Sequence, residues 1–311
     1  MLGNLSAHRE RVAADMAKIF PDPAASGVAA LDWEVWRPWM VIKSWSVYVN
    51  ETLAYVAGLH PGMPRVQLEA EAIRVWNASS LEWLVETAKA MKAARPRIQL
   101  GVYSYPDCYA DRTPFGSDPG CGTFVQGIND ALGPLYDVVD VLMPSIYMEE
   151  DARTKGGDLD ILTHYTDCEL AEARRIKAQR GQPIFPFAWG DKFITGPHGQ
   201  AVPQWEPETR MPLLELSFKV RWVGPWCGVR GVVGQRRAPR AAHGLTHVAS
   251  SPHSQSPRDK GADGLIVWGS SSDSSNVSMC RRWSDFFEGE LGPLIKEASA
   301  PRSSVSAAAA R

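Results

Sequence analysis

The sequence predicts an α/β fold in the form of a (β/α) barrel of the TIM type. Short runs rich in β-branched and aromatic residues alternate with segments of helical period along the chain, and this alternation is typical of right-handed βαβ units with a mostly parallel sheet. Most of these runs also end on polar or aromatic residues. The predicted strands are Val28–Asp32, Ile98–Tyr105, Val138–Tyr147, Ile184–Trp189 and Leu265–Trp268.

The predicted helices lie between and after these strands. The longest covers Gln67–Ala94, in which apolar residues from Leu68 to Met91 recur near the 3.6-residue period. Two further helices are predicted over Glu169–Arg180 and Ser284–Lys296. This order of elements predicts a single barrel domain over residues 1–298.

The strand ends carry the candidate site residues. In a (β/α) barrel the active site forms at the carboxyl ends of the strands. Strand ends of similar character therefore favour a barrel over an open sheet. The residues concerned are Asp32 and Glu34, Tyr103 and Asp107, Ser145 and Tyr147, Trp189, and Trp268.

Asp32 and Glu34 are the most informative pair. Alternate side chains of an extended strand share a face, with Cα atoms roughly 6 to 7 Å apart. Two carboxylates this close cannot both ionise without cost, so one keeps its proton to a higher pH. General-acid attack on a glycosidic oxygen requires such a protonated carboxylic acid. The alternative is an ordinary Asp-x-Glu in a loop, but the neighbours Trp33, Trp36 and Arg37 favour a site.

Composition and charge argue against several other classes. The formal net charge is −2 over 311 residues, whereas general nucleic-acid binding requires a basic footprint. No apolar run approaches the ~18 residues that span a bilayer. The five cysteines form no metal-binding pattern, and we expect no metal and no cofactor. The twelve tryptophans suit stacking on sugar rings as well as core packing.

Residues 220–260 interrupt the predicted domain. From Val220 to Pro257 the chain has five arginines, three histidines and no acidic residue, and no helical or strand period runs through it. A basic arm for an acidic polymer and a disordered insertion are two interpretations. We favour a third, a retained intron in the gene model. The tail Ser299–Arg311, rich in Ala and Ser, is predicted to be disordered.

Several strings resemble the hyaluronidase family, glycoside hydrolase family 56. LDWEVWRP is similar to the acid motif of that family, GVYSYPDCY to its tyrosine–proline–aspartate–cysteine strand, and INDALGPLYDVVDVLMPSIY to the following βα unit. GADGLIVWGSSSD, followed by ELGP, is similar to the last unit, in wording closest to the arthropod and venom members. The resemblance covers nearly everything from Leu2 to Lys296 apart from the interruption.

The resemblance implies a distorted seven-stranded (β/α) barrel that hydrolyses β-1,4 linkages of hyaluronan, and often of chondroitin, by a retaining, substrate-assisted mechanism. Glu34 would be the acid and base, and Asp32 would hold the acetamido nitrogen. Tyr147, with Tyr103 beside it, would hydrogen-bond the acetamido group, and Trp268 would form a wall against its methyl. Further residues that match groups of the family cleft or its disulfide are Arg37, Asp107, Ser145 and Trp189, and the pair Cys108 and Cys121.

The same comparison implies departures from the family. The first one or two strands are expected to lie upstream of Met1, together with the signal peptide of a secreted or lysosomal glycoprotein, so we expect the chain as written to be poorly soluble or inactive. We expect a monomer that binds polysaccharide, with no nucleic acid and no membrane span. The alternatives are a chitinase-like glycosidase, and a non-catalytic glycan-binding relative or an inactive fragment.

Overall fold

The strands form one continuous parallel sheet in the computed structural model, which describes residues 3–34, 36–39, 46–108, 121–147, 159–189 and 261–268, and the single residues Val277, Arg281, Ser284, Asp285 and Glu288. Strands β1 (Gly27–Leu31), β2 (Ile98–Tyr103) and β3 (Val141–Met143) pair in parallel in that order, and β4 (Phe187–Trp189) pairs in parallel with β5 (Ile266–Trp268). Parallel bridges from Leu142 to Ile184 and from Ser145 to Phe187 join the two groups. All five predicted strands are therefore present.

Two strands are shorter than predicted because of proline. The run Val138–Tyr147 forms a ladder only over β3, which Pro144 follows directly. Pro183 and Pro186 flank Ile184 and cannot donate a backbone hydrogen bond, so the next run reduces to one bridge and the three residues of β4. Their carbonyl oxygens still accept, from Leu142 N at 2.9 Å and Ile266 N at 2.9 Å.

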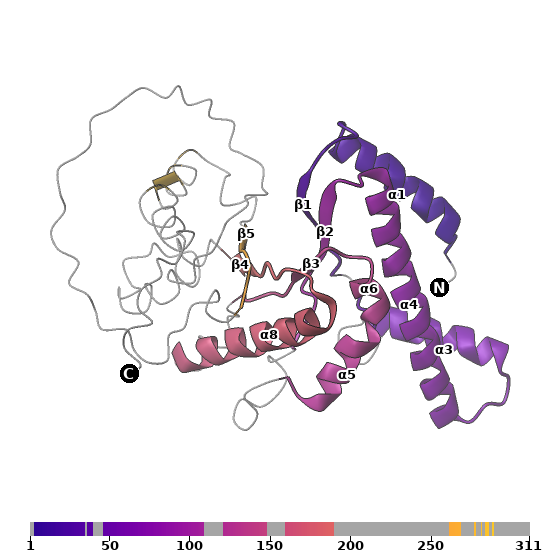
Figure 1. Cartoon of the computed structure of the whole chain (residues 1–311). Coiled ribbons are helices and arrows are strands. Elements are labelled where there is room, and N and C mark those ends of the chain that lie inside the picture. Colours follow the sequence, from indigo (N-terminus) through magenta and orange to yellow (C-terminus); the bar gives the residue numbers. More distant parts are fainter. Residues whose placement is uncertain are drawn as a thin grey trace, which may run out of the picture.

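In the described part of the chain, six helices follow the alternation that the sequence predicts, and Figure 1 shows helices packed beside the sheet. The predicted helix Gln67–Ala94 begins slightly earlier than expected, at Arg65, directly after Pro64. The helix predicted over Glu169–Arg180 begins ten residues earlier, and Ser284–Lys296 lies outside the described residues apart from three single positions. The helical elements are α1 (Leu5–Ile19), α3 (Ser46–Leu59), α4 (Arg65–Ala94), α5 (Thr123–Ala131), α6 (Gly133–Tyr136) and α8 (Leu159–Arg180).

The sheet has two faces, and each strand contributes alternate residues to both. On the outer face Leu100, Leu142 and Ala188 pack against Leu84 of α4 and Leu170 of α8. This arrangement satisfies the period-2 alternation of the strands and the 3.6-residue period of the helices together. The inner face carries a second cluster, which consists of Val28, Val141, Met143, Phe187 and Ile266, with Tyr103, Tyr147 and Phe185 packed against it.

The described strands form an open sheet and do not close into a barrel among themselves. At β1 the inner face is covered only in part: Val28 is buried, whereas Ala30 and Gln99, which lie on the same face, are exposed. The α/β class with parallel strands is thus confirmed, whereas the closed seven-stranded barrel stays a prediction.

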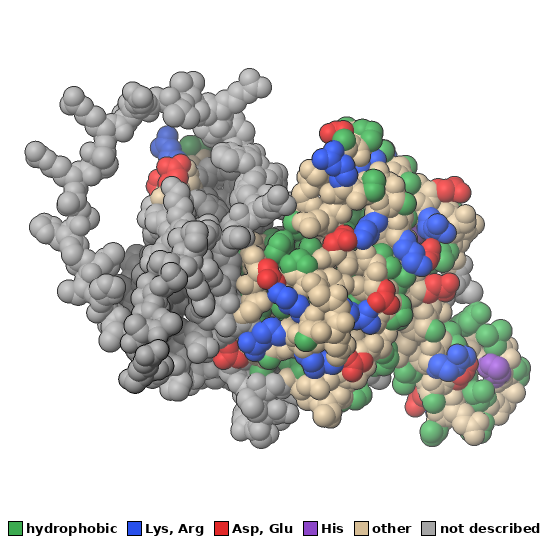
Figure 2. Space-filling view, viewed as in Figure 1, with side chains coloured by type: hydrophobic (Ala, Val, Ile, Leu, Met, Phe, Trp, Pro, Cys, Tyr) green, Lys and Arg blue, Asp and Glu red, His purple; other side chains and the backbone are tan. Residues whose placement is uncertain are grey.

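Charged side chains of both signs are interspersed over the helices in the view of Figure 2. Several form pairs, such as Lys92 with Asp140 at 2.7 Å and Lys177 with Asp263 at 2.5 Å. These pairs are partly exposed to solvent, and ion pairs near the surface contribute only about 0 to 1 kcal/mol each. The stability of the fold therefore comes mainly from the two apolar faces of the sheet.

A substitution at Gly101 tests the packing of the inner face of the sheet. A Cβ at this position would lie 2.5 Å from Sδ of Met143, which is fully buried, so Gly101→Ala should lower the free energy of unfolding by about 1 to 3 kcal/mol through overpacking. Gly127→Ala in α5 is the matched control, because nothing lies within 4 Å of its added methyl and helix propensity favours Ala by ~1 kcal/mol. Thermal melts should show a lower midpoint for Gly101→Ala and an unchanged or higher one for Gly127→Ala. Equal midpoints for the two variants would contradict this packing.

Candidate active site

The acid pair lies immediately after β1. Asp32 and Glu34 are both exposed, while Trp33 between them is partly buried and packs against the helix side of the sheet. The ring of Trp33 meets that of Trp36 edge to face, with centroids 4.8 Å apart. The acid–aromatic–acid order therefore has a structural reason: the indole anchors the segment in the core, and the two carboxylates remain accessible to a ligand.

A pair of tyrosines faces these acids. Tyr103 ends β2 and Tyr147 follows β3, and their ring centroids are 5.6 Å apart. Tyr103 also packs edge to face on Phe187, at 5.0 Å, and its hydroxyl lies 3.4 Å from the hydroxyl of Ser145. Three neighbouring strand ends thus bring together five of the predicted site residues, namely Asp32, Glu34, Tyr103, Ser145 and Tyr147.

The pKa of each phenol is raised. Burial is the main cause for Tyr103, whose pKa rises to about 12, and the negative charges of Glu34 and Asp32 add to it while Ser145 and Arg37 oppose it. Burial also raises the pKa of Tyr147, followed by its interaction with Tyr103 and by the charges of Asp32 and Glu34. Both phenols therefore stay protonated near neutrality and can donate hydrogen bonds. That both carboxylates act on both phenols shows that the four groups share one region.

Arg37 and Asp107 lie beneath the surface of the site. Their exposed fractions are 4% and 6%. The guanidinium of Arg37 stands over the ring of Tyr105, 4.9 Å from its centroid, and Asp107 accepts a hydrogen bond of 3.2 Å from the hydroxyl of Ser104. Burial of this degree favours a supporting role for both residues over direct contact with a polysaccharide. Sequence reasoning assigned them to the cleft lining, and that assignment stays a prediction.

The aromatic cluster behind the acids holds their segment in place. Trp76 of α4 packs against Trp36, with centroids 5.7 Å apart, and its indole N–H donates to the carbonyl oxygen of Arg37 at 3.0 Å. Trp76 and Trp36 are both buried. Part of the tryptophan content thus serves to fix the backbone that follows Glu34.

The remaining two predicted aromatic residues occupy equivalent strand ends. Trp189 ends β4, Trp268 ends β5, and the two lie directly opposite one another in the parallel register. Their side chains lie outside the part of the chain that is described. The substrate wall assigned to Trp268, and the lining role of Trp189, stay predictions.

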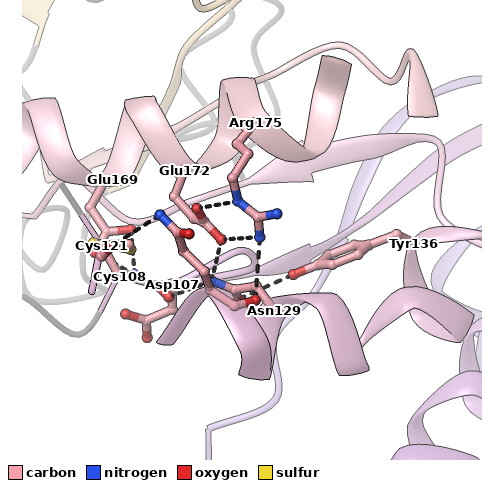
Figure 3. Close-up of a disulfide and its surroundings, with 9 residues drawn as sticks. Asp107, Cys108, Cys121, Asn129, Tyr136, Glu169, Glu172 and Arg175 are labelled. Carbon is pink, nitrogen blue, oxygen red and sulfur yellow. Dashed lines mark hydrogen bonds and ion pairs between the residues drawn. A yellow bond between two sulfur atoms is a disulfide. The ribbon is translucent and has the colours of Figure 1, made fainter. Parts of the chain in front are cut away.

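The predicted disulfide is present. Cys108 and Cys121 are bonded, with Cα atoms 5.2 Å apart, and both are buried with Val125, Ile128 and Cys168. The bond ties the loop after β2 to the start of α5 (Figure 3). This prediction, which rested on the family resemblance, is confirmed.

A buried polar network next to the disulfide was missed by sequence reasoning. Asn129 of α5 and Glu169 and Glu172 of α8 have exposed fractions of 1%, 1% and 2%. Arg175 pairs with Glu172 at 2.8 Å. The spacing of Glu169 and Glu172 is typical of an exposed helix face, so the sequence carries no signal that these acids are buried.

The other predictions from sequence concern absences and undescribed residues. Within the described ranges no group of His, Cys, Asp and Glu side chains could hold a metal ion, and no helix there is long and apolar enough to cross a bilayer. The interruption at 220–260 and the tail at 299–311 lie outside the described residues.

Comparison with known proteins identifies the family. The family model described as Hyaluronidase matches residues 1–190. The chain belongs to the hyaluronidase family. Curated hyaluronidases agree: the honeybee (Apis mellifera) protein is 26% identical over 298 residues, which cover 95% of this chain and 65% of the relative. Human hyaluronidase-1 is 33% identical over 187 residues, covering 59% of this chain and 42% of the relative.

The chain thus spans about two thirds of the honeybee hyaluronidase and less than half of the human one. Solved structures extend the likeness to the fold. Bee venom hyaluronidase superposes with a TM-score of 0.69 at 24% identity, covering 95% of this chain and 79% of that one. The same enzyme in complex with a hyaluronic acid tetramer gives 0.70 at 24% identity, with coverage of 96% and 78%. Family membership favours a hyaluronidase over the chitinase-like alternative.

The raised pKa of Tyr103 predicts a loss of stability at high pH. The pKa of an unfolded tyrosine is about 10, whereas that of folded Tyr103 is about 12. The contribution of the protonated phenol to the free energy of unfolding is therefore fully present below pH ~10 and is lost as the pH rises through about 12. Tyr103→Phe should therefore flatten the fall of the melting temperature over this range. Phe187→Leu is the control, because it loosens the same ring contact without removing a phenol and should shift the whole curve uniformly. Parallel curves for Tyr103→Phe and the parent chain would contradict the raised pKa.

Proposed function

We propose that this chain is an endo-β-N-acetylhexosaminidase that hydrolyses β-1,4 linkages of hyaluronan, and of chondroitin as a second substrate. One observation carries the proposal: two exposed carboxylates and two protonated phenols meet at the carboxyl ends of three adjacent parallel strands, in a member of the hyaluronidase family. The bee venom enzyme of similar fold has been solved with a hyaluronic acid tetramer, which supports the choice of substrate.

The proposed mechanism retains configuration and uses the substrate as its own nucleophile. The acetamido oxygen of a bound N-acetylglucosamine attacks the anomeric carbon while Glu34 donates its proton to the departing glycosidic oxygen. This step gives a cyclic oxazolinium intermediate and a Glu34 carboxylate. That carboxylate then removes a proton from water, whose oxygen attacks the anomeric carbon and reopens the ring, so Glu34 returns to its acid form. Substrate-assisted hydrolysis of this kind is a recognised exception to the scheme with an enzyme nucleophile.

Asp32 and the tyrosines are assigned to the acetamido group. The Asp32 carboxylate accepts from the acetamido N–H and stabilises the positive charge that develops there. Tyr147 donates from the other side, with Tyr103 beside it, and both can do so because their phenols stay protonated. Trp268 forms the wall against the acetamido methyl and Trp189 lines the cleft beside it, which their equivalent strand ends support. Ser145 lies within 3.4 Å of Tyr103 Oη and orients it, while Arg37 and Asp107 support the site from below.

We propose that the sheet closes into the distorted seven-stranded barrel of the family. The TM-score of 0.70 to the bee venom enzyme supports it, as does the partly uncovered inner face at β1. In this proposal residues 1–298 contribute to one catalytic domain, interrupted at 220–260. We infer that the protein is a monomer that is secreted or lysosomal, and the venom origin of a solved enzyme of similar fold supports secretion.

Glu34→Gln is the direct test. The amide is isosteric but cannot supply a proton, so we expect the rate of reducing-end release from hyaluronan to fall by about 10² to 10⁴-fold, the usual contribution of general acid–base catalysis. Glu51→Gln is the matched control, because it removes the same charge from an exposed position on α3. Hyaluronan binding without cleavage by the parent chain would instead support a non-catalytic relative. A rate for Glu34→Gln within a few-fold of the parent rate would contradict the role of Glu34 as general acid and base.

Deletion of residues 220–260 tests whether this segment is part of the domain or an interruption of it. If this segment is a retained intron, its removal joins Lys219 to Gly261, and we expect more soluble protein, a sharper thermal melt and faster hyaluronan cleavage than for the full chain. Deletion of the tail 299–311 serves as the control and should change none of the three. A chain that unfolds or loses activity without 220–260 would show that the segment belongs to the domain.

A further inference from the structure

One peptide group in the loop after β2 is held by side chains from two helices. The carbonyl oxygen of Asp107 accepts a hydrogen bond from Nδ2 of Asn129 at 3.0 Å. The N–H of Cys108, which belongs to the same peptide group, donates to both carboxylate oxygens of Glu169, at 3.0 and 3.1 Å. Figure 3 shows Glu169 on α8 pointing toward Cys108 and Asn129 on α5 lying beside Asp107. Both polar atoms of the peptide group are therefore fixed by side chains that are distant in the sequence.

The acceptor from α8 is a deeply buried carboxylate. Glu169 is 1% exposed, and removing a carboxylate from water costs free energy that only close donors offset. One turn further along α8, Glu172 is also buried, but its two oxygens accept from Arg175 at 2.8 Å each and one of them from Asn129 at 2.9 Å. Two adjacent acids are thus held inside the fold next to one short loop. An apolar residue at 169 could fill the same space but could not accept the hydrogen bond from the Cys108 N–H.

The clamped peptide group is connected to the site through the side chain of Asp107. The carboxylate of Asp107 accepts from the hydroxyl of Ser104 at 3.2 Å, and Ser104 is the residue after Tyr103. Ser104 has a left-handed backbone (φ 61°) and its N–H donates to the carbonyl oxygen of Met143 at 2.9 Å. Because the Cα–Cβ bond of Asp107 extends from the clamped group, the orientation of that group sets where its carboxylate meets Ser104. A change at Glu169 can therefore reach Tyr103 through Cys108, Asp107 and Ser104.

We propose that Glu169, together with Asn129, is a positioning residue: the two side chains clamp the Asp107–Cys108 peptide group and thereby fix the direction of Asp107 and Tyr103 in the active site. The inference rests on the proposed function, because it assigns Tyr103 to the binding of the acetamido group. The clamp itself is a structural feature that can be measured without turnover.

Two substitutions of Glu169 in the full chain separate the acceptor from the volume of the side chain. Glu169→Met keeps the length but removes the acceptor, so kcat for hyaluronan cleavage should fall by about 10-fold or more while KM changes less than ~3-fold, the pattern of a misplaced group. Glu169→Gln retains one neutral acceptor oxygen and should recover most of kcat. Amide hydrogen exchange of the peptide that contains Cys108, followed by mass spectrometry, should be fastest in Glu169→Met and intermediate in Glu169→Gln.

Ser80→Ala is the control for stability alone. It removes a buried hydrogen bond from the Ser80 hydroxyl to the Trp76 carbonyl oxygen, within α4, and should lower the melting temperature without changing kcat or the exchange at Cys108. Unchanged exchange in both Glu169 variants would overturn the clamp. Faster exchange with unchanged kcat would overturn the positioning role. A parent chain that exchanges slowly at Cys108 but releases no reducing ends would refute the proposed function, and with it the catalytic part of the inference, while leaving the clamp established.

Discussion

The parallel register of β1, β2 and β3 is the constraint on which the candidate site depends. Leu31 pairs with Val102, and Tyr103 pairs with Met143. Asp32 therefore emerges next to Tyr103, and Tyr147 emerges just past the end of the third strand. A slip of one residue in either ladder would turn the site residues toward the helices and the apolar residues toward the ligand. The packing of both sheet faces opposes such a slip, because β1, β3 and β4 each bury neighbouring residues in the two different clusters.

Gly101 shows how closely the register and the packing are linked. The side chain of Met143 occupies the space that a Cβ of Gly101 would take, and it is fully buried. Met143 also exchanges backbone hydrogen bonds with Tyr105, at 2.8 and 3.3 Å. One residue of β3 thus fixes both the inner core under the site and the turn that carries the chain from Tyr103 toward Asp107.

Beneath the acids and tyrosines lies a supporting layer with two parts. On the β1 side, the Trp33, Trp36 and Trp76 cluster holds the backbone after the acids through ring packing and the indole hydrogen bond to Arg37. On the β2 side, polar side chains of α5 and α8 hold the loop that the disulfide closes. The first part is apolar and the second polar because the first holds a segment of backbone and the second holds a single peptide group. An aromatic wall fixes a segment by shape, whereas a single peptide group is fixed through its N–H and carbonyl.

The sequence by itself determined the α/β class, the position of each described strand, the helix in α4 and the candidate residues at the strand ends, because these depend on local period and on the rule that parallel strands end at one edge. The resemblance in motifs identified the disulfide and the family. Only the tertiary structure decided which polar residues are buried. Glu169 and Glu172 have the spacing of a solvent-exposed helix face, and Arg37 and Asp107 have the composition of a cleft lining, yet all four are buried. Burial depends on which elements pack together at long sequence separation, and that is not encoded in the local pattern around a single charged residue.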